Sequence, residues 1–385
     1  MTSAASDYSS RAQRMARELS ARSDEIAAAR ELPADISSAF AEAGFYHLLV
    51  PAELGGAEAH PGELVSVLEI LSAADGSAGW CAMISSQTGL LAASLSEMHA
   101  RQIYGTYGVN TCGVVAPCGR ADVVDGGYRV TGRWPFASGC TNADWICGGA
   151  MVYEADTLRE AGPGQPESHL MLFRVDDVRI HDTWYVSGLE GTGSHDIEVA
   201  NVFVPEGRSV RLDRAPRIDR PLYRLPILGV LAIGISAVAL GIGRRALNEF
   251  CELAQSKNPT GSDRPLAART SAQEDVALAA AQLRAARAYI DAALTEAWQM
   301  AETRPVTAFD QRANLRLAAA YATRVSADAV DRLYTAAGGS SPYRTSALQR
   351  CFRDIHVVTQ HAMVAQPIFE ATGRVLLGDD PERPL

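Results

Sequence analysis

The stretch Arg353-Asp354-Ile355-His356-Val357-Val358-Thr359-Gln360-His361-Ala362 carries two histidines near the end of a 385-residue chain. Histidine is well suited to move a proton near neutral pH, because its ordinary pKa is about 6.5. His361 is the stronger candidate for such a role and His356 the weaker, since residues five apart do not share a helix face well. On these residues alone, a histidine in an alanine-rich helical segment is more often packed in a core than catalytic.

A second stretch, Trp134-Pro135-Phe136-Ala137-Ser138-Gly139-Cys140, combines aromatic rings with a hydroxyl and a glycine. It follows a β-rich run, so we expect Ser138 at the end of a strand. There its hydroxyl can bond to the local backbone or serve a site. Phe136 can likewise fill a β core or offer its ring to a ligand. We expect Trp134 and Trp145 to be structural.

The composition excludes several classes of protein. The net charge is −10 and no run of lysine and arginine occurs, so we expect no nucleic-acid partner. The seven cysteines are odd in number and show no Cys-x-x-Cys spacing, which argues against a disulfide framework and fits a reducing cytoplasm. The histidines lack the spacing of metal ligands, so no metal site is predicted.

One segment has the length and composition of a membrane span. Residues 225–243 carry no charge, but they include Pro226 and four glycines and stand alone in an otherwise soluble sequence. We interpret the segment as a helix buried on all sides of a helical bundle, with no membrane involved. The alanine-rich helices around it carry more apolar surface than one bundle needs to hide, which predicts a homotetramer built on this region.

The order of the periodic segments predicts an α+β, mostly α chain in three parts. Residues 1–110 show helical spacing, residues 111–218 show short β-rich runs, and residues 219–385 show long helical segments typical of a four-helix bundle. Asp125-Gly126-Gly127 indicates a hairpin turn. Helices are expected at residues 9–30, 33–44, 61–74, 77–95, 227–255, 271–302, 308–338 and 346–377.

Five segments in this order resemble the acyl-CoA dehydrogenase superfamily. They are the stretch from Leu32-Pro33 to Gly55-Gly56, Ala116-Pro117-Cys118-Gly119, residues 132–145, residues 188–194 and residues 350–361. The resemblance covers nearly the whole chain. It implies an N-terminal helical domain, a middle β-barrel domain and a C-terminal four-helix bundle that together hold a flavin.

Within that superfamily, the pattern Arg353-Asp354-x-His356-x-x-x-x-His361 resembles the two-component flavin-dependent monooxygenases, the group D hydroxylases. Ala362 stands where dehydrogenases often place a catalytic glutamate, and alanine cannot take a proton. The resemblance implies an enzyme that uses reduced FMN or reduced FAD and O₂. Through a C4a-hydroperoxyflavin it would hydroxylate, or N- or S-oxygenate, a small substrate of aromatic type.

The source of electrons is also predicted. Residues 188–193 are not a dinucleotide-binding fingerprint, because no βαβ unit surrounds them. Reducing equivalents should therefore arrive from a separate NAD(P)H-dependent flavin reductase. The Arg-x-x-Phe-Gly segment with which dehydrogenases often hold FAD is missing after Glu252, which favours FMN or a reduced flavin that is bound only transiently.

The resemblance assigns roles to single residues. His361 would lie beside the flavin and the substrate, and would deprotonate the substrate hydroxyl or steady the flavin peroxide. Ser138 would contact flavin N5, and Phe136 would pack on the ring. The other contacts implied are the backbone amides of Ala116 and Cys118 at the pyrimidine edge, Gly191, Thr192 and Ser194 at a phosphate, and Trp80 and Thr88 beside the substrate. Without the resemblance, residues 191–194 fit a tight turn equally well.

Two other functions stay open at this point. One is an acyl-CoA dehydrogenase-like desaturase, which needs a carboxylate base. Glu370 is the candidate, but it is eight residues beyond Ala362 and too far along a helix to replace it directly. The other is a non-catalytic helical scaffold of the same fold, which would leave His361 and Ser138 without a role.

Overall fold

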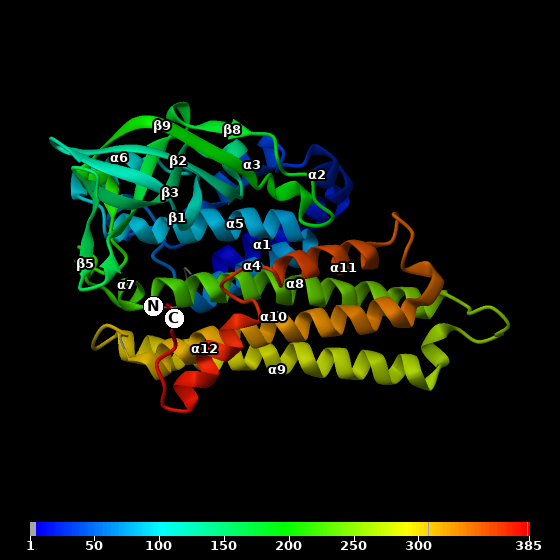
Figure 1. Cartoon of the computed structure of the whole chain (residues 1–385). Coiled ribbons are helices and arrows are strands. Elements are labelled where there is room, and N and C mark those ends of the chain that lie inside the picture. Colours follow the sequence, from blue (N-terminus) through cyan, green and yellow to red (C-terminus); the bar gives the residue numbers. More distant parts are fainter. Residues whose placement is uncertain (1–4, 307, 383) are drawn as a thin grey trace.

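The computed structural model describes residues 5–306, 308–382 and 384–385, and it arranges them in layers (Figure 1). A sheet forms one side, helix α5 (Gly76–Thr88) lies beneath it, and the long C-terminal helices form the other side. The predicted architecture, α+β and mostly α, is confirmed. The other N-terminal helices are α1 (Ala5–Ala21), α2 (Ser23–Ala29), α3 (Ala34–Ala43), α4 (Pro61–Ala74) and α6 (Glu97–Tyr104).

The N-terminal helices end at identifiable residues. The single helix predicted over residues 9–30 is wrong: α1 and α2 are separated at Arg22, whose backbone leaves the helical region (φ −102°, ψ 8°). Arg22 forms ion pairs with Glu25 and Asp35, so its side chain joins α2 to α3. Helix α3 ends at Gly44 in the left-handed conformation (φ 79°), as expected for a glycine that caps a helix.

Apart from a separate small hairpin of β5 and β6, the strands form one mixed sheet in the order β10-β7-β3-β1-β2-β9-β8, and β4 pairs with β3 beside this path. The predicted hairpin at Asp125-Gly126-Gly127 is present, and Gly126 takes a positive φ of 75°. Strand β1 runs parallel to β3, and β7 also touches β9, so the sheet curls on itself. The strands are β1 (Thr111–Val124), β2 (Gly127–Ala137), β3 (Trp145–Glu154), β4 (Thr157–Leu158), β5 (Glu160–Gly162), β6 (Gln165–Pro166), β7 (Ser168–Arg174), β8 (Arg179–His181), β9 (His195–Pro205) and β10 (Ser209–Val210).

Trp134 organises the core of the sheet. It is fully buried, and its Nε1–H donates to the carbonyl of Gly149 at 2.7 Å. A Cβ on Gly119, Gly132 or Gly148 would lie only 2.4–2.7 Å from the indole ring, so glycine at these positions makes room for it. The structural role expected for Trp134 is confirmed, and its packing fixes the end of β2, where the predicted flavin contacts lie.

The C-terminal helices differ from the prediction at one place. The helix predicted over residues 346–377 is wrong: it is interrupted at residues 359–366. The amides of Gln360 and His361 bond to carbonyls three residues back, which tightens the chain into a turn, and Pro367 then starts a new helix. His361 therefore lies in a turn. The helices are α7 (Pro221–Arg224), α8 (Ile227–Ser256), α9 (Thr270–Ala301), α10 (Phe309–Ala337), α11 (Ala347–Val358) and α12 (Pro367–Leu376).

Helix α8 contains the uncharged segment and lies at the centre of the molecule. In the part of the chain that the structure describes, it is the one helix long and apolar enough to cross a membrane, yet 78% of its apolar window is buried inside the protein. Its glycines admit neighbours: a Cβ on Gly234 would lie 2.2 Å from Gln87 of α5, and one on Gly241 would lie 2.6 Å from the Glu69 carbonyl of α4. Internal packing thus accounts for the segment, and the homotetramer stays a prediction.

Candidate active site

A chain of hydrogen bonds links α5 to the end of β2 and to the loop before β9. The Trp80 Nε1–H donates to Ser138 Oγ at 3.0 Å. Ser138 Oγ lies 2.6 Å from Ser194 Oγ, which lies 2.7 Å from Thr192 Oγ1. Thr192 Oγ1 in turn donates to the carbonyl of Leu189 at 2.8 Å. All four side chains of this hydroxyl chain (Trp80, Ser138, Ser194 and Thr192) are buried, so the bonds are shielded from water.

His361 lies at the Trp80 end of the hydroxyl chain. The two rings are 5.7 Å apart between centroids and tilted by 59°. The Nδ1 atom of His361 accepts a hydrogen bond from the Met363 amide at 3.2 Å. Burial, assisted by the charge of Arg316, lowers the pKa of His361 to about 4. The imidazole is therefore neutral at pH 7, and because Nδ1 is an acceptor, its hydrogen is on Nε2.

Helix α11, which leads to His361, also holds the loop that carries the hydroxyl chain. The Leu189 amide donates to Asp354 Oδ1 at 2.7 Å, and Arg353 donates to the Ser187 carbonyl at 2.5 Å. A Cβ on Gly188 would lie 2.4 Å from the Arg353 carbonyl, so the loop and helix touch backbone to backbone. Arg353 and Asp354 are structural, and each binds the loop.

Asp354 is buried together with Asp75, the residue that caps α5 by accepting from the Ala78 amide. Burial is the main cause that raises the pKa of Asp354, to about 7, and the nearby Asp75 raises it further, whereas the Leu189 hydrogen bond and Arg353 act against it. Burial raises the pKa of Asp75 as well. The free energy of unfolding should therefore depend on pH through this pair.

We expect Asp354→Asn to raise the free energy of unfolding at pH 8 by roughly 1–4 kcal/mol. The folded-state pKa lies above the ordinary value, so the carboxyl's contribution to stability is full below about pH 4 and is lost as the pH rises through 7. Asparagine does not ionise and keeps an oxygen for the Leu189 amide. Urea unfolding should show that the difference in free energy of unfolding between Asp354→Asn and the wild type is smaller at pH 5 than at pH 8. Asp354→Ala, which lacks the acceptor, should be less stable at both. A less stable Asp354→Asn at pH 8 would contradict this explanation.

Phe136 and the neighbouring β1 backbone form an apolar ledge beside Ser138. Phe136 is 68% exposed. Its backbone φ is 67°, a value that residues other than glycine rarely adopt. The pairing of β2 with β9 is interrupted here, as is that of β1 with β3 between Val114 and Gly119. The second interruption leaves Ala116 and Cys118 exposed. An exposed ring on a strained backbone, next to a buried hydroxyl, fits a flat aromatic cofactor such as flavin.

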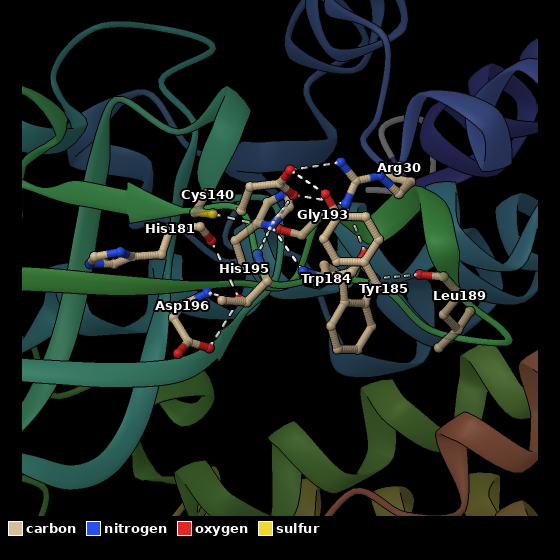
Figure 2. Close-up of polar contacts among 11 residues, drawn as sticks. Arg30, Cys140, His181, Trp184, Tyr185, Leu189, Gly193, His195 and Asp196 are labelled. Atoms are coloured by element: carbon tan, nitrogen blue, oxygen red, sulfur yellow. Dashed lines mark hydrogen bonds and ion pairs between the residues drawn. The ribbon is translucent and has the colours of Figure 1, made fainter.

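Trp184 supports this ledge, and Figure 2 shows how it is held. Its ring meets Phe136 edge to face, with centroids 6.3 Å apart. Its Nε1–H donates to the Leu189 carbonyl at 3.1 Å, and its amide donates to His195 Nδ1 at 3.2 Å. Burial lowers the pKa of His195, so that ring is neutral and Nδ1 can accept. Arg30 also belongs to this cluster: its guanidinium carbon lies 4.0 Å from the centroid of the Tyr185 ring.

Residues 191–194 form a tight buried turn. A Cβ on Gly191 would lie 2.2 Å from Ile26 Cγ2, so the turn packs directly on α2. Gly193 has a φ of 51°. The Ser194 hydroxyl contacts Ser138, and the Thr192 hydroxyl contacts Ser194 and the Leu189 carbonyl. The phosphate contact expected for these residues stays a prediction.

Other predicted residues lie outside the hydroxyl chain. Thr88 is on the same face of α5 as Ile84, one turn further, and its hydroxyl bonds back to the Ile84 carbonyl at 2.7 Å. His356 pairs with Asp331 at 2.9 Å, so the weaker histidine candidate has a partner on α10. Glu370, which a desaturase would need, is exposed on α12. No group of three or more metal-binding side chains occurs among the described residues.

A cavity of about 1100 Å³ opens between the sheet and the start of α8. Val115 and Pro117 of the interrupted β1 segment line it, together with Leu90 beyond the end of α5. It is large enough for a bound molecule of one or two rings. The cavity therefore reaches the backbone that was predicted to contact the flavin.

The sequence carries two family signatures that agree with this geometry. Residues 8–101 match the acyl-CoA dehydrogenase N-terminal domain, and residues 233–366 match the acyl-CoA dehydrogenase C-terminal domain. The chain belongs to the acyl-CoA dehydrogenase superfamily, as the sequence resemblance indicated.

Individual relatives indicate the class of enzyme within this superfamily. The chain is 34% identical to the indole-3-acetate monooxygenase of Pseudomonas putida, over 94% of this chain and 91% of that one. It is 30% identical to the oxygenase component of an FADH₂-dependent resorcinol hydroxylase from a Rhizobium species, over 92% and 90%. The crystal structure of 3-HSA hydroxylase from Rhodococcus sp. RHA1 superposes with a TM-score of 0.89 at 27% identity, covering 98% of both chains. The chain is thus a flavin-dependent monooxygenase of the two-component type, and its cofactor is reduced flavin.

Proposed function

We propose that this chain oxygenates a small aromatic substrate lying between a reduced flavin and His361. The relatives that support the substrate class are named for indole-3-acetate and resorcinol, both aromatic. The observation that carries the proposal is the position of Trp80, which touches both predicted catalytic residues: it donates to Ser138 and its ring lies against His361. Bound reduced flavin would supply the two electrons needed for one oxygen atom of O₂ to enter the product and the other to form water.

The residues that would hold the flavin come from both sheet interruptions. Phe136 would offer its ring, Ser138 would face N5, and the backbone of Ala116 and Cys118 would lie at the pyrimidine edge. The exposure of Phe136, Ala116 and Cys118 supports the arrangement, because a bound ring would cover apolar surface that is otherwise open to water. Val115 and Pro117, on either side of Ala116, line the cavity of about 1100 Å³.

His361 has two conceivable roles, and its contacts favour one. With Nδ1 bonded to the Met363 amide, the Nε2 atom carries the hydrogen and can donate it to substrate or bound oxygen. Acting as a base through Nε2 would require the hydrogen to move to Nδ1, which breaks that bond. We therefore assign His361 the role of a hydrogen-bond donor that steadies negative charge.

The chain alone should not consume NADH, and product should form only when reduced flavin is supplied. We expect a purified flavin reductase, FMN or FAD, NADH and ¹⁸O₂ to give a product of indole-3-acetate, resorcinol or a related aromatic with one ¹⁸O atom. The same mixture without this chain is the control. NADH oxidation by the chain alone, or a panel of small aromatics in which no product carries ¹⁸O, would count against the proposal.

Location and assembly belong to the same proposal. All seven cysteines are free thiols, which supports a reducing compartment, and we place the enzyme in the cytoplasm. Exposed apolar side chains on the C-terminal helices, including Leu278, Phe309 and Tyr321, support assembly into a homotetramer.

A further inference from the structure

We propose that Thr192 and Ser194 are positioning residues that fix the Ser138 hydroxyl as a hydrogen-bond acceptor, and so make the site select reduced over oxidised flavin. The inference rests on the proposed function, because it takes flavin N5 to face Ser138. It goes beyond that function in explaining how the protein, by the direction of its own hydrogen bonds, distinguishes the two redox forms.

The direction of every bond in the hydroxyl chain follows from counting hydrogens. The Leu189 carbonyl can only accept, so the single hydrogen of Thr192 Oγ1 points at it. Thr192 then has only lone pairs to offer Ser194, and the Ser194 hydrogen must point to Thr192. Ser194 in turn can only accept from Ser138, so the Ser138 hydrogen points to Ser194.

Trp80 completes the count at the other end. Its indole N–H is a donor only, and it occupies one lone pair of Ser138 Oγ at 3.0 Å. Ser138 has one hydrogen, which Ser194 takes, and two lone pairs, of which Trp80 takes one. One lone pair is left for a ligand, and toward that ligand Ser138 can accept but cannot donate.

The two redox forms of flavin differ at the atom that meets this lone pair. Reduced flavin carries a hydrogen on N5 and can donate it, whereas N5 of oxidised flavin is itself an acceptor. An acceptor facing an acceptor makes no hydrogen bond, and leaving a buried polar group without a partner is unfavourable. The hydroxyl chain therefore favours the reduced form.

The direction is locked because both ends of the chain are fastened to backbone. The Leu189 amide is bound by Asp354, and its carbonyl also accepts from Trp184. The Thr192 carbonyl accepts from the Gly139 amide at 2.8 Å, which ties the turn to the residue after Ser138. Reversing the chain would leave Thr192 Oγ1 and the Leu189 carbonyl oxygen 2.8 Å apart with no hydrogen between them, so the contact would no longer be a hydrogen bond.

The test is the ratio of two dissociation constants, those of oxidised and reduced FMN, measured by anaerobic titration. In Ser194→Ala the hydrogen of Ser138 is released and can donate to N5 of oxidised FMN. We expect oxidised FMN to bind roughly three- to tenfold more tightly than to the wild type, as one hydrogen bond allows, with reduced FMN changed less. Thr192→Val, which removes the acceptor for Ser194, should shift the ratio the same way.

Matched variants distinguish an effect of hydrogen-bond direction from an effect of side-chain packing. Thr192→Ser and Ser194→Thr keep the hydroxyls and should keep the wild-type ratio. A merely structural role would weaken both redox forms alike and leave the ratio unchanged in Ser194→Ala, which would overturn the inference. If the wild-type chain binds neither form of FMN or FAD, the proposed function itself fails and the inference with it.

Discussion

Replacing His361 by alanine is expected to lower the rate of product formation by about 10²–10³, the usual cost of removing one donor that steadies developing charge. The neutral ring presents Nε2–H because Nδ1 accepts from the Met363 amide. His361→Gln is the informative partner, since its side-chain amide N–H reaches about as far as Nε2–H but cannot act as a base. Partial recovery in His361→Gln would support the donor role. Equal loss in both variants would favour the base.

The pH dependence tests the protonation state assigned to the same ring. The ordinary pKa of histidine would place a titration between roughly pH 6 and 8. Because burial lowers the pKa of His361 to about 4, the ring stays neutral across that range, and we expect the wild-type rate of product formation to stay level there. A clear titration near pH 6.5 that disappears in His361→Gln would contradict this assignment.

Replacing Ser138 by alanine is expected to divert flavin oxidation from product to hydrogen peroxide, with product formed per flavin oxidised falling by about tenfold or more. Ser138 offers the one lone pair that can hold the hydrogen on N5. In the alanine variant no side chain at this position would hold that hydrogen. Substrate binding should persist, because Trp80 and His361 remain in contact.

The control for this variant is Ser138→Thr, which keeps a hydroxyl at the same position. Ser138→Ala also leaves the buried Trp80 N–H without its acceptor, which should cost about 1–3 kcal/mol of stability. Unfolding curves will show that cost, and the ratio of peroxide to product is compared at equal concentrations of folded protein, because free reduced flavin also gives peroxide in air. An unchanged ratio in Ser138→Ala would remove Ser138 from the flavin site.

Local sequence signals predicted the elements whose ends depend on nearby residues. Helix α4 (Pro61–Ala74), the turn at Gly126 and the cap at Gly44 all lie where glycine and proline conformations place them. The break before Pro367 was missed because the residues from Ser346 onward keep a helical spacing. The tight turn at His361 is stabilised by bonds that the spacing of apolar residues does not report.

The candidate site was only partly predictable for a related reason. Family resemblance named Trp80, Ser138, Thr192 and Ser194 separately, and the structure joins them into one chain. The Trp80–Ser138 bond spans 58 residues, and the bond from Leu189 to Asp354 spans 165. No periodicity or local motif reports contacts over such separations, so the direction of the hydroxyl chain could be read only once the fold was known.

The most direct test is a crystal structure of the chain grown without oxygen in the presence of reduced FMN or FAD. We expect a flavin ring lying against Phe136, with N5 about 3 Å from Ser138 Oγ. We also expect His361 Nε2 on the substrate side of the ring. A flavin bound away from Phe136, or turned so that Ser138 faces an atom other than N5, would contradict this expectation.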